Sequence, residues 1–193
     1  MYKKLSRNQM LDILNNMNRS EHMKKSLEIT DRVIASNEFQ SADTIGITIS
    51  RYPEVDTRPL IEAAWEAGKQ IAVPKCLHAT REMDFRLITT FDNLETVYVD
   101  LLEPIIDKTV SVGKNEIDLQ IVPGVVFSEE GYRVGFGGGY YDRYLQGYKG
   151  ETLSLAFAIQ TGQAVPVEPH DIPVGRIFTE EKVIVCHGSE RCK

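Results

Sequence analysis

Four glycines lie within five positions at residues 135–139, and this cluster is the part of the sequence best suited to hold a ligand. Glycine has no Cβ, so it reaches positive φ and lets a bound group come close to the backbone. The run from Tyr140 to Gln146 is predicted to start a helix, which would leave unpaired N–H groups facing the loop. The cluster therefore predicts an anion-binding loop, with a glycine-rich turn packed over tyrosines as the alternative.

Charged side chains flank the glycine cluster. Arg133 and Arg143 carry fixed positive charge that suits phosphate, and Asp142 is a candidate ligand for a hard cation such as Mg²⁺. Two common nucleotide motifs do not fit. Tyr140 takes the place of the third glycine in Gly-x-Gly-x-x-Gly, and the cluster does not end in Gly-Lys-Ser/Thr. The charges favour phosphate and metal without identifying the nucleotide.

The stretch around the cluster resembles the signature of the 5-formyltetrahydrofolate cyclo-ligase family, also called 5,10-methenyltetrahydrofolate synthetases. The matching residues are Pro123-Gly124, Phe127, Gly131, Arg133, Gly135 and the run Gly137-Gly138-Gly139-Tyr140-Tyr141-Asp142-Arg143. Many members have an arginine where this chain has Phe136. The resemblance implies catalytic roles for Arg133 and Tyr140. It also implies an ATP site made of Arg133, Val134, Gly135, Phe136, Gly137, Gly138, Gly139, Tyr140 and Tyr141.

A basic group at the N-terminus extends the resemblance. Lys3, Lys4 and Arg7 lie at the start of a helix predicted from Leu5 to about Asn18, and on charge alone they would form a solvated basic end. The family has a Lys-x-x-Leu-Arg element here that contacts ATP. The run from Lys4 to Arg7 is similar, with its arginine one residue late. The resemblance implies that Lys3, Lys4 and Arg7 contact ATP.

Residues after two predicted strands resemble the folate-binding segments of the family. Ligands bind at the carboxyl ends of strands in open α/β sheets, and Glu54 and Asp56 follow the strand predicted at Thr44–Ile49. The alternative role for Asp56 is support of the N-terminus of the next helix. The alternative role for Met83 and Phe85 is packing in the core. The resemblance implies a substrate site of Arg51, Glu54, Asp56, Met83 and Phe85.

Asp171 completes the predicted site. The element His170-Asp171-Ile172-Pro173 resembles a His-Asp-x-Pro element of the family. The resemblance implies that Asp142 and Asp171 bind Mg²⁺, and that ATP is the co-substrate. The reaction implied is ATP-dependent cyclisation of 5-formyltetrahydrofolate to 5,10-methenyltetrahydrofolate through an iminium phosphate, with release of ADP and phosphate. The alternatives are a sugar-phosphate isomerase or CoA-transferase-like enzyme, or a nucleotide- or folate-binding module without catalysis.

The elements that must position these residues alternate between strand and helix. The strands predicted at Thr44–Ile49 and Ile71–Pro74 are separated by a helix from Arg58 to Ala67, which implies parallel pairing with a crossover. Further helices and strands are predicted by their periodicity: a helix capped by Ser20, and strands at Met83–Ile88, Leu119–Val122, Leu153–Ile159 and Val183–Val185. The fold class predicted is α/β, a three-layer, Rossmann-like arrangement of a mainly parallel sheet with helices on both faces.

The whole chain is predicted to form one domain, residues 1–193, with a frayed tail at 188–193. A net charge of −6 argues against a nucleic-acid protein. The three cysteines form no Cys-x-x-Cys pair, which favours reduced thiols, and no apolar run approaches the roughly 20 residues of a membrane span. We expect a cytoplasmic protein that is a monomer or weak dimer and binds neither nucleic acid nor membrane.

Overall fold

The computed structural model describes residues 2–98 and 101–187, so the tail predicted at 188–193 lies outside the described residues. The helices are α1 (Tyr2–Asn15), α2 (Arg19–Ile34), α3 (Asn37–Ser41), α4 (Arg58–Glu66) and α5 (Tyr140–Leu145). The main sheet contains β1 (Thr44–Gly46), β2 (Gln70–Leu77), β3 (Glu82–Ile88), β6 (Val110–Ser111), β7 (Leu119–Ile121), β10 (Glu151–Leu155), β11 (Arg176–Phe178) and β12 (Val183–Val185). Two short pairs are β4 (Leu94–Thr96) with β5 (Leu102–Pro104), and β8 (Val126–Phe127) with β9 (Arg133–Val134).

The strand order of the main sheet is β12-β11-β10-β7-β1-β2-β3-β6. The central strands β11, β10, β7, β1 and β2 are parallel, whereas β12, β3 and β6 join antiparallel at the edges. The predicted crossover is confirmed, since α4 connects β1 to β2 and Ile45 pairs with Ile71. From β1 the chain builds outwards through β2, and it later returns to add β7 on the other side of β1. The strand order therefore reverses between β1 and β7, which is where open α/β sheets place their ligands.

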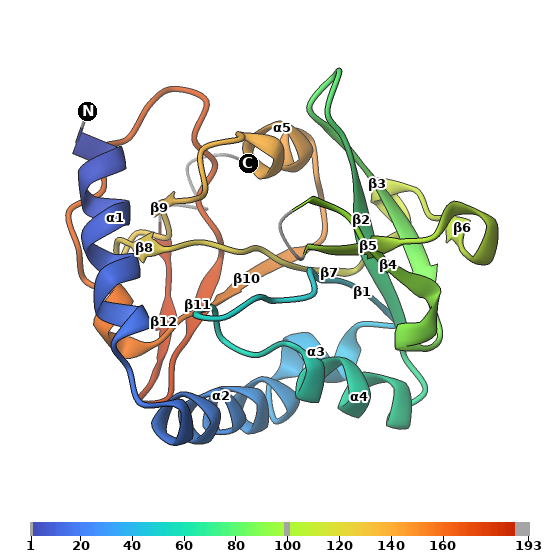
Figure 1. Cartoon of the computed structure of the whole chain (residues 1–193), viewed down its shortest axis with the longest axis horizontal. Coiled ribbons are helices and arrows are strands. Elements are labelled where there is room, and N and C mark those ends of the chain that lie inside the picture. Colours follow the sequence, from blue (N-terminus) through green and yellow to red (C-terminus); the bar gives the residue numbers. More distant parts are fainter. Residues whose placement is uncertain (1, 99–100, 188–193) are drawn as a thin grey trace.

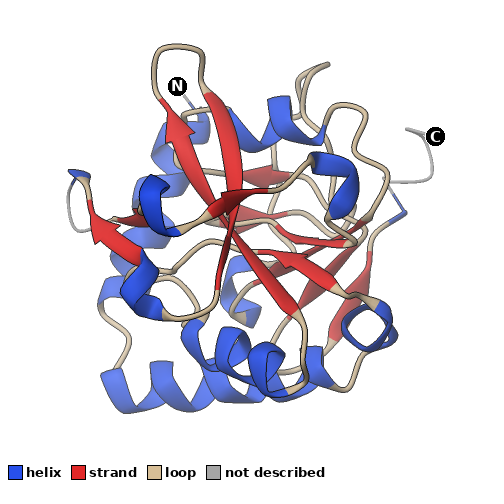
Figure 2. Ribbon diagram, turned by 90° about the vertical axis from the view of Figure 1, so that its right-hand side faces the viewer, coloured by secondary structure: helices blue, strands red, loops and turns tan. Residues whose placement is uncertain are grey.

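Helices cover both faces of the sheet, but unequally (Figures 1 and 2). On one face, apolar residues of α1 to α4 such as Leu14, Ile29 and Leu60 pack against Leu119 and other strand residues. On the opposite face only α5, among the described helices, contributes a buried residue, Leu145, and its tyrosines pack beside it. The mainly parallel α/β fold is confirmed. Because α5 is short, the face that it covers leaves space near the carboxyl ends of the strands for loops.

Local hydrogen bonds shift several predicted boundaries. Helix α2 begins at Arg19 rather than after Ser20, because the side chain of Asn18 accepts a hydrogen bond from the Ser20 N–H and caps it. Strand β10 ends at Leu155 instead of Ile159, since a 3-10 turn follows at Ala158–Gln160. Among the described residues, no helix has the length and apolar character needed to cross a membrane.

Candidate active site

Two adjoining cavities lie above the carboxyl ends of the central strands. The larger, about 350 Å³, is lined by the first turns of α1, the loop 133–142 and the loop 168–171, and we call it the polar compartment. The smaller, about 140 Å³, is lined by Ile49, Glu54, Val73, Leu101 and Leu102 among others, and we call it the apolar compartment. They share five wall residues: Thr48, Pro74, Cys76, Pro123 and Phe136. Segments distant in the sequence thus form one two-part cleft.

The glycine cluster bends through two left-handed residues. Gly137 has φ of 99° and Gly139 has φ of 66°, and these are positions that favour glycine. Gly138 is not left-handed, but a Cβ there would lie 2.6 Å from the ring of Tyr140. Glycine is therefore required at this position by contact rather than by φ. Helix α5, which follows, has six residues, so the N–H groups of the loop matter more to an anion than the helix dipole does.

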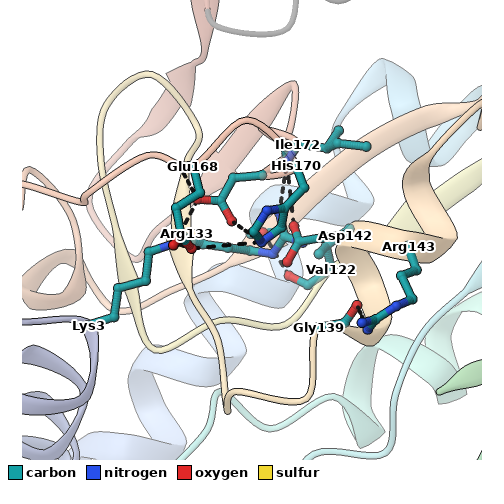
Figure 3. A network of polar contacts seen from close by, with 11 residues as sticks. Lys3, Val122, Arg133, Gly139, Asp142, Arg143, Glu168, His170 and Ile172 are labelled. Carbon is teal, nitrogen blue, oxygen red and sulfur yellow. Dashed lines mark hydrogen bonds and ion pairs between the residues drawn. The ribbon is translucent and has the colours of Figure 1, made fainter. Parts of the chain in front are cut away.

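Two of the three predicted basic residues of α1 face the polar compartment. Lys3 and Arg7 are one helical turn apart and both line it, whereas Lys4 is exposed and does not. The Lys3 Nζ lies 2.9 Å from Glu168 Oε2 (Figure 3). It also lies 2.7 Å from Asp171 Oδ2. Burial alone would lower the pKa of Lys3, but its bonds to these carboxylates outweigh burial and raise the pKa. The Arg7 guanidinium donates to the carbonyl oxygen of residue 135 over 3.2 Å.

Arg133 is buried and already bound within the protein. Its side chain is 4% exposed, and its Nη2 donates to Asp142 Oδ1 over 2.9 Å. Its Nη1 donates to the Ile172 carbonyl over 2.7 Å, so the guanidinium ties the glycine loop to the segment after β10 (Figure 3). Arg133 also lines the polar compartment, so its predicted contact with phosphate stays a prediction. In this position Arg133 fixes the carboxylate of Asp142.

Carboxylates suited to a hard cation gather on one wall of the polar compartment. Asp142, Asp171 and Glu168 all line it, and the ligand atoms of Glu168, His170 and Asp171 lie within 4.8 Å of one another. Carboxylate oxygens are the donors that Mg²⁺ prefers. Asp171 belongs to this close group and Asp142 does not, so the part of Asp142 in a Mg²⁺ site stays a prediction. Glu168 was missed from the sequence, although its position three residues before Asp171 was a usable signal.

The two tyrosines at the start of α5 differ in their surroundings. Tyr140 Oη lies 3.0 Å from Nδ1 of His78, an exposed residue of the β2–β3 hairpin that sequence reasoning also missed. Tyr141 Oη is buried and, within the described part of the chain, has no hydrogen-bond partner. Burial raises the pKa of Tyr141 well above its ordinary value, so it stays protonated. Its hydroxyl is a donor without an acceptor beside the polar compartment.

Glu54 is one of two carboxyl groups that line the apolar compartment, and the other is Glu103. Burial raises the pKa of Glu54 to about 7, although a backbone hydrogen bond from Arg51 and the charge of that residue oppose the shift. A carboxyl group that titrates near neutrality can exchange a proton under ordinary conditions. Phe136 is 48% exposed and lines both compartments, so an aromatic residue lies at their boundary.

Three of the predicted folate residues are placed elsewhere. Met83 lines the polar compartment as part of the cleft, but Phe85 is 2% exposed and packs in the core, 4.7 Å from the ring of Tyr144 between centroids. Asp56 Oδ1 accepts a hydrogen bond from the Arg58 N–H and so supports the start of α4. Neither it nor the exposed Arg51 lines either compartment. For Asp56 and Phe85 the structure therefore agrees with the structural alternatives.

Comparison with known proteins gives matches along nearly the whole chain. A model of the 5-formyltetrahydrofolate cyclo-ligase family matches residues 1–180. A 5-formyltetrahydrofolate cyclo-ligase of Mus musculus is 31% identical over 174 residues, 83% of this chain and 85% of the mouse protein. One from Escherichia coli (strain K12) is 35% identical over 147 residues, 74% of this chain and 80% of its own. The NMR structure of Aquifex aeolicus 5,10-methenyltetrahydrofolate synthetase superposes with a TM-score of 0.85 at 28% identity, covering 97% of this chain and 94% of that one.

Proposed function

This chain belongs to the 5-formyltetrahydrofolate cyclo-ligase family, and we propose that its two compartments bring ATP and 5-formyltetrahydrofolate together for cyclisation to 5,10-methenyltetrahydrofolate. The observation that carries this proposal is the shared wall. A loop suited to phosphate and a set of carboxylates open directly onto an apolar space that contains Glu54. Family membership replaces the isomerase-like and non-catalytic alternatives, since the matched relatives are named as enzymes of this one family.

The first step activates the formyl group. Its oxygen is a poor leaving group, so it attacks the γ-phosphorus of ATP, the bond from that phosphorus to the ADP oxygen breaks, and an iminium phosphate forms. Positioning and charge stabilisation dominate such transfers. The backbone N–H groups of Gly137 to Gly139 and the guanidinium of Arg7 hold phosphate oxygens in this proposal. The hydroxyl of Tyr141 donates to another, which gives that buried group an acceptor.

The second step closes the ring. N10 of the folate attacks the activated carbon, the bond from that carbon to the phosphate oxygen breaks, and N10 loses a proton. We assign acceptance of this proton to Glu54, because its pKa of about 7 suits a general base at neutral pH. Phe136, which lines both compartments, supplies an apolar wall for the folate rings, and Met83 adds an apolar contact from the side of the polar compartment. Tyr140 is kept in place by His78 and closes the cleft beside the glycine loop.

Mg²⁺ as a cofactor is part of the proposal. Asp142, Asp171 and Glu168 would hold the ion, and Arg133 keeps the first of these carboxylates in position. Bound there, the ion would neutralise charge on the phosphates. In this proposal Arg133 contributes to the ATP site through Asp142.

The test is the ultraviolet absorbance of the methenyl product. Purified protein mixed with ATP, Mg²⁺ and 5-formyltetrahydrofolate is expected to generate the chromophore, and omission of either substrate is expected to abolish it. Conversion that continues at the same rate with a chelator would remove the metal from the proposal. Folded protein that forms no chromophore with all components present would overturn the function.

The proposal also includes a cytoplasmic location and a monomeric or weakly dimeric state. Burial raises the pKa of the Cys76 thiol to about 12 and that of the Cys186 thiol to about 11, so both are poor nucleophiles that resist oxidation. This supports the expected cytoplasmic location. Light scattering coupled to size-exclusion chromatography tests whether the protein is the monomer or weak dimer expected.

A further inference from the structure

The ammonium of Lys3 is bound to the same carboxylate wall that the proposed metal needs. It lies 2.7 Å from Asp171 Oδ2 and 2.9 Å from Glu168 Oε2, across 168 and 165 residues of sequence. The Asp171 side chain is 10% exposed, and its Oδ2 also accepts a hydrogen bond from the Glu168 N–H over 2.8 Å. This oxygen therefore has two donors already. A divalent ion that uses it must replace one of them, and the side chain is easier to move than the backbone.

We propose that Lys3 is a positioning residue that serves as an exchangeable counter-ion. Before ligands arrive it holds the carboxylates of Asp171 and Glu168 in place, and it releases them when the metal and nucleotide enter together. Its ammonium then turns to the phosphates. The inference rests on the proposed function for the identity of the nucleotide, whereas the exchange itself concerns only the metal and this chain.

The neighbouring charges explain why Lys3 would leave the carboxylates when a metal ion and a nucleotide bind. An ammonium and a divalent cation at one carboxylate repel each other, and two acids cannot neutralise both. A nucleotide brings the additional negative charge that accommodates the ammonium. Arg7, one turn further along α1, donates to a carbonyl oxygen and forms no ion pair within the described part of the chain. The same helix face thus already presents one cation for phosphate, and Lys3 would become the second.

The Lys3 side chain is built to move. It is 29% exposed, it stands in the first turn of α1, and lysine presents a compact charge on a flexible stem. Its partner Glu168 is 56% exposed and is equally free to turn. Because the metal and nucleotide both favour the released state, each is expected to increase the affinity for the other.

The experiment compares Lys3→Met with Lys4→Met, which removes the same charge from an exposed neighbour on the same helix. Mn²⁺ alone, without nucleotide or folate, is titrated and followed by electron paramagnetic resonance. A non-hydrolysable ATP analogue with Mg²⁺ is titrated by calorimetry. For Lys3→Met we expect Mn²⁺ to bind at least about threefold tighter, the scale of a lost competing ion pair, and the analogue about tenfold weaker. Lys4→Met and the charge-preserving Lys3→Arg are expected to stay near wild type in both titrations.

Tighter binding of Mn²⁺ together with weaker binding of the ATP analogue by Lys3→Met would identify exchange. Unchanged or weaker Mn²⁺ binding by Lys3→Met would overturn the proposal, and so would an equal gain by Lys4→Met, which would show a general charge effect. An unchanged affinity for the analogue would overturn transfer of the ammonium to phosphate. The Mn²⁺ titration requires neither folate nor turnover, so its failure is distinct from absence of the methenyl product, which tests the function.

Discussion

The two compartments of the cleft are built by different means. In the polar compartment, charged groups already have partners within the protein: Lys3 is bound to Asp171, and Arg133 is bound to Asp142. In the apolar compartment, strand ends and loops form mainly hydrophobic walls that include two acids, Glu54 and Glu103, and part of that surface stays exposed. The polar compartment is thus defined by hydrogen bonds and ion pairs, and the apolar compartment mainly by its hydrophobic surface.

The difference decides how each compartment gains affinity. A ligand of the polar compartment exchanges existing bonds for new ones, so its net gain per contact is small and depends on which charges are released. A ligand of the apolar compartment covers exposed apolar area and gains in proportion to that area. Substitutions of the ion-paired side chains in the polar compartment should therefore affect nucleotide binding, metal binding and stability together. Substitutions of the hydrophobic walls in the apolar compartment should affect folate binding selectively.

The largest effect is expected from Gly138→Val. The new side chain would begin 2.6 Å from the Tyr140 ring, displace it and fill the space that phosphate needs. Misplacement of about 1 Å costs about a hundredfold in rate, so turnover is expected to fall at least that far. The loop is on the surface, so the melting temperature should change by only a few degrees. Turnover and melting temperature are measured on the same preparation.

Gly147→Val is the matched control for that change. Gly147 follows α5 with φ of 69° and lies outside the walls of both compartments. A branched residue there is strained, so it should lower stability while turnover per folded molecule survives. If Gly138→Val gave this same pattern, the glycine loop would serve the fold and the polar compartment would lose its phosphate site.

Glu54→Gln is expected to change how stability depends on pH. The folded-state pKa of about 7 lies above the ordinary 4.5, so between these values the folded protein keeps a proton that the unfolded chain has released. Wild-type stability therefore falls as pH rises from about 4.5 to 7 and stays lower above that, by about 3 kcal/mol. The variant cannot ionise, so in urea unfolding it should match wild type at pH 5 and exceed it at pH 8. Parallel profiles would mean that Glu54 is not held in an apolar space.

Local patterns in the sequence were enough to predict the fold. The buried runs of the parallel strands and the α4 crossover follow from spacing and residue type, and both are confirmed. The same-face spacing of Lys3 and Arg7 also follows from helical geometry. What failed was the prediction of how far the cleft extends along one strand. Met83 and Phe85 share a face of β3, but only the first reaches the cleft, because α5 lies over the second.

The pairing of charges was not predictable from the sequence. The bond from Lys3 to Asp171 joins residues 168 positions apart, and the bond of Arg133 to Ile172 depends on how a distant loop returns to the sheet. From the sequence, Lys3 and Arg133 were both predicted to contact ATP. A sequence motif does not show which charged side chains also form bonds within the folded protein. Asp56 illustrates the same limit on a short scale, since its carboxylate caps α4 two residues on.

Arg133→Ala is expected to have the next largest effect and to reveal the exchange character of the polar compartment. It leaves Asp142 without its cation, which in a fully buried pair costs 3–5 kcal/mol. Asp142 is 24% exposed and water can reach it, so we expect a loss of about 2 kcal/mol in urea unfolding. Affinity for the Mg²⁺–ATP analogue should fall with it. Arg143→Ala, which removes an exposed arginine bound only to loop carbonyls within the described chain, should stay within about 0.5 kcal/mol. A weaker nucleotide complex at unchanged stability would make Arg133 a phosphate ligand after all.

The smallest effects are expected from a pair of substitutions that test the division itself. Phe136 contributes its backbone to the glycine loop, and its half-exposed side chain belongs to a residue that lines both compartments. Stacking of an aromatic ring on a flat ligand contributes about 0.5–1.5 kcal/mol beyond area burial. Phe136→Ala should therefore weaken binding of 5-formyltetrahydrofolate, titrated without ATP, by about three- to tenfold and leave the ATP analogue unaffected. Arg7→Met should do the reverse, because its guanidinium reaches the polar compartment alone. If either substitution weakened both ligands equally, the cleft would act as one site, and affinity for folate would depend on the same bonds that hold the nucleotide.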